Sequence, residues 1–343
     1  MKITKKQIFD IYSKMYLSRK LDERQLMLLK QGKGFFHIGA SGHEAAQLAA
    51  SSFVDLSKDF SYPYYRDQAY CIGLGMSSKE ILLSFLAKRD DPNSSGRQMP
   101  QHFSHKKLKI VSQSSPTGTQ YLQALGAAFA LDKDKNGGVA YVSSGEGTTS
   151  QGDFHESLNW ASREKAPIIF HVENNNFAIS VPIEEQTAGK SVYDIASGYD
   201  SLMRFNVDGC DYFESKLAFQ KAFKRTRNGM GPSLIVSNVV RLLPHSSSDD
   251  HRKYRTEKDI NDDVKRDPIK LFINTCCSKY GLTKNDFKKI EDSIDSQITN
   301  DLEWALKQDE PNKESYSDNL FSNDWGIQKA TEPSYVSDKT VLV

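Results

Sequence analysis

Apolar residues recur every three or four positions over residues 5–30, and this spacing predicts a long amphipathic helix near the start of the chain. Similar spacing predicts helices that begin near His43 and that cover residues 78–88 and 119–131. Residues 89–118 lack this spacing and are rich in Ser, Gly, Pro and Gln. A loop of that length in a compact domain is either functional or disordered.

The middle of the chain alternates between short apolar runs and amphipathic stretches. We predict strands at 139–143, 167–173, around Val207 and at 233–240, with helices at 151–164 and 213–228. The strands are almost continuously apolar, which is typical of a parallel sheet buried on both faces. The expected fold is therefore α/β, with a mostly parallel sheet and helices on both of its faces. We expect one domain over residues 1–307, followed by a polar linker or tail at 308–343.

The composition narrows the class of protein. The 343 residues include 45 Lys and Arg against 44 Asp and Glu, which gives no electrostatic reason to expect binding to nucleic acid or to an anionic membrane. No apolar run is long enough to span a bilayer, and the N-terminal segment lacks the apolar core of a signal peptide. Four cysteines are too few for a disulfide framework in so long a chain. We expect a cytoplasmic protein with reduced thiols.

A glycine-framed turn, Gly145-Glu146-Gly147, joins the predicted strand 139–143 to the next helix. A strand, such a turn and a helix start usually bind phosphate. The dinucleotide fingerprint, however, needs a third glycine where Ser150 stands. A carboxylate about 4 Å from a phosphate costs ~4 kcal/mol at an effective dielectric near 20, more than the ~1 kcal/mol gained at a helix N-terminus. Glu146 fits a phosphate site only if a cation such as Mg²⁺ lies between the two anions.

A second oxygen ligand is available at the end of the next strand. The predicted strand 167–173 is followed by Asn174-Asn175-Asn176. Adjacent parallel strands end in the same crevice, where open α/β sheets bind their ligands. We therefore expect Glu146 and Asn175 to meet there and to bind Mg²⁺. The alternative is a tight turn followed by an ordinary asparagine-rich loop.

This pair of motifs is similar to that of thiamine diphosphate enzymes, which have a Gly-Asp/Glu-Gly loop followed by Asn-Asn. From about residue 19 to about residue 255, the chain resembles the alpha subunit of the decarboxylating first component of 2-oxo acid dehydrogenase complexes, particularly the branched-chain type. The resemblance rests on the stretches "RKLDERQLMLLKQGKGFFHIGASGHEAA", "YYRD", "GRQMPQHF", "SSPTGTQ", "GEGTTSQGDFH", "ENNNFAIS", "VDGCD" and "PHSSSDDHRKYR". It implies a thiamine diphosphate-binding fold.

The resemblance implies a role for each matching residue. Glu146, Asn175 and the backbone carbonyl of Phe177 would bind Mg²⁺, and Tyr65 and Arg66 would hold the diphosphate, because a guanidinium makes paired contacts to phosphate. Without the family, this last pair reads as an aromatic packing corner with a surface arginine. The cofactor-binding residues implied are Tyr65, Arg66, Ser115, Thr117, Gly145, Gly147, Thr148, Asn175 and His245.

The segment from Ser114 to Gln120 is similar to a family stretch with two functions. Ser115 and the backbone at Thr117 would face the cofactor, although the family commonly has Leu at the latter position. In branched-chain members the stretch also supplies oxygens to a structural potassium ion, here from Ser114, Pro116, Thr119 and Gln120. The alternative is a helix N-terminus capped by Ser or Thr. Glu173 also departs from the family, which has Arg before Asn-Asn, so any phosphate contact of that arginine is lost or replaced.

His245 matches a catalytic histidine on a mobile loop of the family, implicated in acyl transfer to a lipoyl group, and its chemistry suits proton transfer. Ser246 lies where mitochondrial relatives are phosphorylated; the alternative is that the three serines only form a flexible loop. The near-zinc motif "HEAAQ" has Gln47 in place of its second His, so we expect helix packing near the cofactor instead of a metal site.

The resemblance implies an alpha–beta enzyme that oxidatively decarboxylates a 2-oxo acid and transfers the acyl group to a lipoyl-bearing acyltransferase. The glutamate that activates the cofactor would come from a beta subunit or from a fused beta domain, to which the tail 308–343 would lead; the tail would otherwise be an arm that packs on the partner. We expect a branched-chain substrate, with pyruvate as the alternative. A nicotinamide-dependent oxidoreductase and a non-catalytic scaffold subunit are the rivals from other classes.

Overall fold

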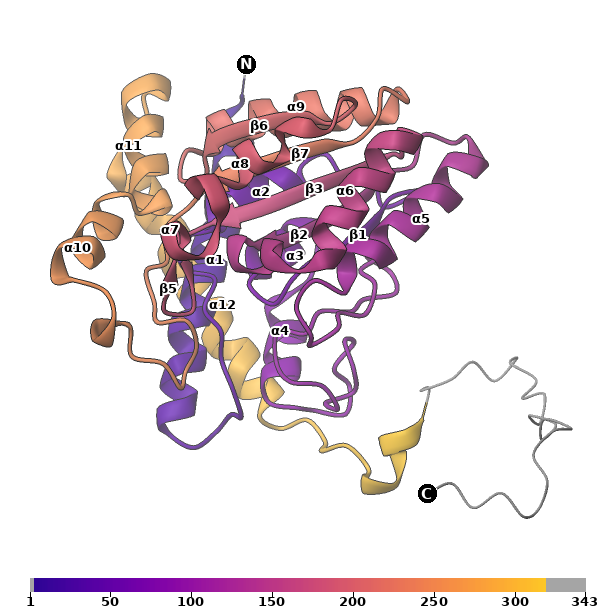
Figure 1. The fold of residues 1–343 in the computed structure, drawn as a ribbon. Coiled ribbons are helices and arrows are strands. Elements are labelled where there is room, and N and C mark those ends of the chain that lie inside the picture. The colour runs from indigo at the N-terminus through magenta and orange to yellow at the C-terminus, as the bar shows by residue number, and fades with distance from the viewer. Residues whose placement is uncertain (1–2, 319–343) are drawn as a thin grey trace, which may run out of the picture.

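The computed structural model describes residues 3–318 and contains a five-stranded sheet with the order β1-β2-β3-β7-β6 (Figure 1). All four pairings in this sheet are parallel. The strands are β1 Phe60–Tyr62, β2 Ala140–Gly145, β3 Ile168–Asn174, β6 Met203–Asp208 and β7 Ser233–Asn238. A separate antiparallel hairpin pairs β4 Phe177–Ala178 with β5 Val181–Pro182.

Helices account for most of the remaining regular structure. The longer ones are α1 Lys5–Lys30, α2 Glu44–Ser51, α3 Gln68–Leu74, α4 Ser78–Phe85, α5 Gln120–Asp134, α6 Gly152–Glu164, α9 Tyr212–Arg227, α10 Glu257–Lys265, α11 Pro268–Tyr280 and α12 Lys284–Ala305. Two short ones, α7 Ile183–Gln186 and α8 Val192–Ile195, lie between the hairpin and β6.

The elements predicted from the apolar spacing are present, and most of their ends agree to within about three residues. Helix α1 begins where predicted because Thr4 and Gln7 form a capping box around its first turn. Strand β1 was not predicted, since three residues carry too little periodicity to be recognised. Helices α3, α10 and α12 were not predicted either.

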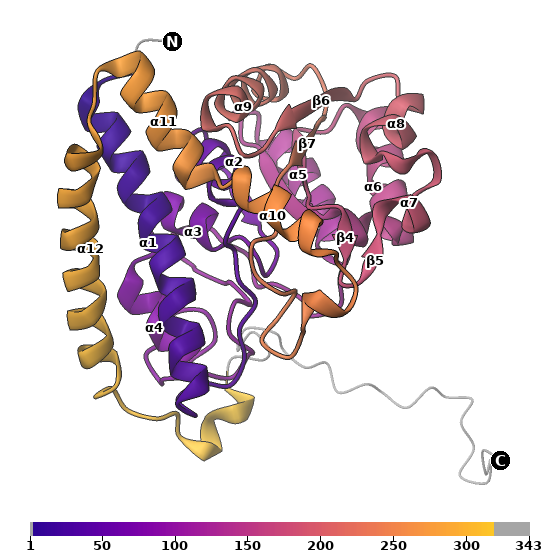
Figure 2. The same ribbon diagram turned by 90° about the vertical axis from the view of Figure 1, so that its left-hand side faces the viewer.

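The sheet is covered on both faces, which confirms the predicted α/β class. Tyr141 and Ile235 face one hydrophobic cluster, together with residues of α1, α2, α3, α9, α11 and α12. Val142 and Phe170 face the other cluster, formed with α5, α6 and α8. Figure 2 shows α1, α11 and α12 as an outer layer on one side of the molecule, and α6, α7 and α8 on the opposite side.

The register of β2 and β3 fixes the edge where a ligand site is expected. Gly145 pairs with Glu173, so the residues that follow both strands leave the sheet at the same edge. Residues 89–118 contain no helix or strand before α5, only isolated bridges such as Ser61 to Ile110.

The segment that follows α12 is held by ion pairs against residues 88–89, at the start of the long loop that precedes α5. Glu310 forms an ion pair with Lys88 at 2.5 Å, and Asp309 forms one with Arg89 at 2.9 Å. The predicted linker at 308–343 is therefore ordered along residues 308–318, while its remainder, with the predicted lead into a beta domain, lies outside the described residues. Within residues 3–318 no helix combines the length and the apolar character needed to cross a membrane.

Candidate functional site

A cavity of about 260 Å³ opens at the carboxyl ends of β2 and β3. It is lined by residues 64–66, 145–148 and 177–179, and by Thr117, Asn175 and His245. This set includes the three predicted Mg²⁺ ligands and all of the predicted cofactor-binding residues except Ser115. The folded chain therefore brings together residues from five separate parts of the sequence.

Glu146 lines this cavity and is buried, with a relative exposure of 1%. Its Oε2 accepts a hydrogen bond from the backbone N–H of Asn175 at 3.1 Å, whereas its Oε1 has no hydrogen-bond partner among residues 3–318. Burial raises the pKa of Glu146, because the charged form has lost its hydration. A buried carboxylate with one free oxygen is suited to receive a cation.

Asn175 and Phe177 lie in a tight turn opposite this carboxylate. The side-chain oxygen of Asn175 accepts a hydrogen bond from the N–H of Phe177 at 3.3 Å. Between them Asn176 has a φ of +67°, in the left-handed region that asparagine tolerates better than most residues. The turn brings Asn175 and Phe177 to the cavity that Glu146 also lines, and the carbonyl of Phe177 accepts a hydrogen bond from Arg241 at 3.5 Å.

Arg66 is the buried cation of the site, with a relative exposure of 2%. Its guanidinium donates hydrogen bonds to the carbonyl of Gly39 and, at 3.3 Å, to the carbonyl of His245, and it lies 5.5 Å from the ring centre of Tyr65. No carboxylate forms an ion pair with Arg66 in the part of the chain that the structure describes. A buried guanidinium without a counter-ion favours an anionic ligand.

A second buried guanidinium, Arg241, lies behind the cavity and was not predicted. It donates to the carbonyl of Ile179 at 3.0 Å and to the hydroxyl of Tyr254 at 2.7 Å. Burial lowers the pKa of Arg241, and the charge of Arg66 lowers it further. The signal in the sequence was a lone arginine directly after the predicted strand 233–240; in the structure Arg241 lies three residues past the end of β7.

His245 lines the cavity next to Arg66. Its backbone N–H donates to Asp249 at 2.7 Å, and its ring is in edge contact with Tyr65, with 6.1 Å between the ring centres. Burial lowers the pKa of His245 to about 3, and the charges of Arg66 and Arg241 add to this effect. The imidazole is therefore neutral near pH 7.

The segment 114–120 contributes to the cavity only through Thr117. Ser115 instead shares a hydrogen bond of 2.6 Å with His102, outside the lining. The Thr119 hydroxyl donates to the carbonyl of Pro116 at 3.1 Å, and Gln120 donates to the carbonyl of Ser143 at 3.1 Å. The oxygens predicted to hold potassium thus lie in the turn that opens α5, and Ser114 is half-buried there.

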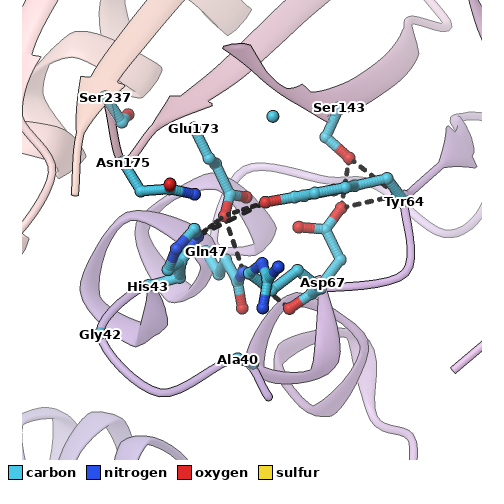
Figure 3. Close-up of polar contacts among 12 residues, drawn as sticks. Ala40, Gly42, His43, Gln47, Tyr64, Asp67, Ser143, Glu173, Asn175 and Ser237 are labelled. Atoms are coloured by element: carbon cyan, nitrogen blue, oxygen red, sulfur yellow. Dashed lines mark hydrogen bonds and ion pairs between the residues drawn. The ribbon is translucent and has the colours of Figure 1, made fainter. Parts of the chain in front are cut away.

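Glu173 is fully buried and is not among the residues that line the cavity, and Figure 3 shows its carboxylate directed at His43, Gln47 and Tyr64. Its Oε2 lies 2.5 Å from Nδ1 of His43, and it accepts hydrogen bonds from Gln47 at 2.8 Å and from the Tyr64 hydroxyl at 3.2 Å. His43 and Gln47 are the ends of the "HEAAQ" stretch, so this helical i, i+4 pair binds a carboxylate. Asp67 lies beside Glu173, and burial raises the pKa of both carboxyl groups.

Comparison with known proteins places the chain in a family. Residues 12–314 match the model of the dehydrogenase E1 component family. The chain is 43% identical over 287 residues to the 2-oxoisovalerate dehydrogenase subunit alpha of Bacillus subtilis, covering 84% of this chain and 86% of that protein. It is 34% identical over 309 residues to the pyruvate dehydrogenase E1 component subunit alpha of Staphylococcus aureus strain Mu50, covering 89% of this chain and 79% of that protein. The corresponding pyruvate dehydrogenase subunit of Bacillus subtilis is 35% identical over 273 residues, which is 79% of this chain and 70% of that protein. The chain therefore belongs to the dehydrogenase E1 component family of thiamine diphosphate-dependent enzymes.

Proposed function

We propose that the chain is the alpha part of an alpha–beta enzyme that oxidatively decarboxylates a 2-oxo acid and transfers the acyl group to a lipoyl-bearing acyltransferase. The observation that carries the proposal is the meeting of Glu146 and Asn175 at the ends of adjacent strands, in a cavity that is also lined by the unpaired guanidinium of Arg66. Family membership argues against the two rival classes, a nicotinamide-dependent oxidoreductase and a non-catalytic scaffold.

The residues present fit a magnesium diphosphate. Glu146 offers a free oxygen, Asn175 and the carbonyl of Phe177 offer two more, and Mg²⁺ completes its octahedron with phosphate and water oxygens. Arg66 and Tyr65 would bind the diphosphate, with backbone N–H groups of the turn 145–148. The cation explains the carboxylate between two glycines, because it separates that charge from the phosphates.

The turn also requires a close approach of two backbone segments. A Cβ atom on Gly147 would lie 2.8 Å from the Cβ of Ala178, in the segment that carries the Phe177 carbonyl. Glycine at this position therefore allows the turn and the Asn175–Ala178 segment to lie against each other.

When bound, thiamine diphosphate supplies the carbon nucleophile and the electron sink that decarboxylation needs. The chain's own contribution at the mouth of the site is His245. Because Arg66 faces its Nδ1 with a donor at 3.4 Å, the neutral imidazole carries its hydrogen on Nε2. His245 can hold or exchange a proton there during acyl transfer to the lipoyl group.

A potassium ion is a further part of the proposal. The carbonyl of Pro116 accepts from Thr119, and the amide oxygen of Gln120 accepts from Gly118 at 3.2 Å, so each oxygen retains a lone pair for an ion. With Ser114 and Thr119 they would form a site at the start of α5. Replacing potassium by sodium should lower the melting temperature of the assembled enzyme if this ion is bound.

The beta partner is inferred from the glutamate that activates the cofactor, for which the cavity offers no candidate among residues 3–318. Glu146 is the one carboxylate among the residues that line the cavity within 3–318, and the proposal assigns it to the metal. The glutamate that activates the cofactor must then come from a beta subunit or a fused beta domain.

The substrate follows from the relatives. A branched-chain 2-oxo acid is favoured because the relative at 43% identity is named for 2-oxoisovalerate, whereas the pyruvate dehydrogenase relatives are at 34–35%. Pyruvate is the alternative substrate.

The test is carbon dioxide release from 3-methyl-2-oxobutanoate and from pyruvate, with Mg²⁺ and thiamine diphosphate present. The chain alone should be inactive, and adding the beta part should restore turnover, faster on the branched substrate. Decarboxylation by the chain alone would refute the two-part site, whereas a preference for pyruvate would refute only the substrate assignment.

A further inference from the structure

Glu173 is the fully buried carboxylate at the end of β3, two positions before Asn175. Three side chains converge on its Oε2: Nδ1 of His43 at 2.5 Å, the amide of Gln47 at 2.8 Å and the hydroxyl of Tyr64 at 3.2 Å (Figure 3). The function proposed above uses none of these contacts.

Two of these partners hold the turn that carries Arg66. Tyr64 begins this turn, and its ring lines the cavity while its hydroxyl is bound to Glu173. Gln47 donates to the carbonyl of Arg66 at 3.0 Å and accepts from the N–H of Ala69 at 3.1 Å. Glu173 therefore contacts the turn directly through Tyr64 and indirectly through Gln47.

The backbone of Glu173 belongs to the other half of the site. Glu173 pairs with Gly145 in the register of β2 and β3, and β3 continues from it towards Asn175. One residue thus joins the strand ends that carry the predicted metal ligands to the turn that carries the predicted diphosphate ligands.

Fold stability alone does not explain a carboxylate here. Removing a carboxylate from water is costly, and an apolar side chain of similar volume is often as stable in such a place. Three polar side chains directed at one oxygen instead fix the geometry of the segments to which they belong.

We propose that Glu173 is a positioning residue, which sets the Tyr64–Asp67 turn, and with it Arg66, at the distance from Glu146 and Asn175 that a magnesium-bound diphosphate requires. This inference rests on the proposed function. His43 and Gln47, the i, i+4 pair of "HEAAQ", act with Glu173 as the support of this turn.

The test measures the affinity of the assembled enzyme for thiamine diphosphate, by calorimetry in the presence of Mg²⁺. Glu173→Ala should weaken binding about tenfold to a hundredfold, the usual effect of removing a group that orients ligand residues. Glu173→Gln should restore most of the affinity, because its amide oxygen still accepts from Tyr64 and Gln47. Asp59→Asn is the matched control: Asp59 is also buried and holds Arg227 at 2.7 Å, but at the opposite end of the sheet, so binding should be unchanged.

A double variant separates positioning from general destabilisation. If Glu173 acts through Arg66, then Glu173→Ala should add little to the loss caused by Arg66→Gln. Full additivity, or unchanged affinity in Glu173→Ala, would overturn the inference.

If Glu173→Ala does not fold, Tyr64→Phe provides the same test, since it removes only the hydroxyl that binds Glu173. Affinity in Tyr64→Phe equal to that of the unmodified enzyme would overturn the inference, and a loss of about threefold or more would support it. Absence of Mg²⁺-dependent binding in the unmodified enzyme would instead refute the proposed function, so the two failures are distinguishable.

Discussion

The carboxylate of Glu146 accepts a hydrogen bond from the backbone N–H of Asn175 at 3.1 Å, across the ends of β2 and β3. Within residues 3–318 the other carboxylate oxygen of Glu146 has no hydrogen-bond partner. The same contact holds Asn175 beside the carboxylate. The two residues directly follow adjacent parallel strands, so the register of the sheet brings them together.

Glu146→Ala should abolish the Mg²⁺-dependent binding of thiamine diphosphate, and Asn175→Ala should weaken it by more than about tenfold. The reason is that these residues supply two of the three protein oxygens proposed for the metal. Calorimetry of the assembled enzyme, with and without Mg²⁺, measures the effect. Glu164→Gln, an exposed change at the end of α6, is the control and should bind normally. Unchanged affinity in Glu146→Ala would refute the metal assignment.

Gly147→Ala should weaken cofactor binding, because the added Cβ would lie 2.8 Å from the Cβ of Ala178 and displace the segment of the Phe177 carbonyl. Overpacking of this kind costs about 1–3 kcal/mol in the free energy of unfolding, which denaturant titration can measure. Adding the change Ala178→Gly to Gly147→Ala should restore cofactor binding and the free energy of unfolding, because it removes the facing methyl group. Gly152→Ala, where a Cβ meets nothing within 4 Å, is the control and should change neither.

His245→Ala should lower the overall activity with the lipoyl-bearing acyltransferase by more than about tenfold, since a proton-transfer group typically contributes about 10²–10⁴-fold. Decarboxylation assayed with an artificial electron acceptor should fall less. Because burial holds the pKa of His245 near 3, its protonation should not cause a fall in activity between about pH 6 and pH 8. Equal losses in the two assays would point to a role in cofactor binding or decarboxylation.

Because His171 is buried as a neutral imidazole, the folded protein should be less stable in mild acid than near neutral pH. It is fully buried between the Tyr141 hydroxyl at 2.8 Å and the Ser237 hydroxyl at 2.9 Å, and burial lowers its pKa to about 3. The unfolded chain, with a histidine pKa of about 6.5, binds this proton more readily than the folded chain. The stabilising effect is therefore complete above pH ~6.5 and is lost as the pH falls from there towards pH 3.

Urea unfolding at a series of pH values measures this loss, which approaches ~1.4 kcal/mol per pH unit for one proton. His171→Gln should lower the free energy of unfolding at every pH. It should also remove the part of the dependence of this free energy on pH that comes from His171. His155→Gln, at an exposed position of α6, should leave the slope unchanged. An identical slope in His171→Gln and the unmodified protein would contradict the prediction.

The apolar spacing of the sequence determined the sheet and most of its helices. Strands buried on both faces have to be apolar throughout, and helices that cover them have to be apolar on one side, so both leave a pattern that can be read locally. The pairing of Glu146 with Asn175 could be predicted for the same reason, since parallel strands joined by one helix end at the same edge. Strand β1 left no such pattern, because it has three residues and depends on β2 for its pairing.

Only the tertiary structure decided which charged residues are deprived of water, and therefore which of them need a partner. Without the family resemblance, nothing in the sequence near Arg66 or Arg241 indicates burial, yet they are only 2% and 1% exposed, because segments that lie far away in the chain cover them. The contacts of Glu173 also depend on segments that are distant in the chain. Its carboxylate meets His43 and Gln47 because the start of α2 lies beside the end of β3 in the folded chain. Desolvation and long-range contact are properties of the folded chain, whereas periodicity is a property of each segment.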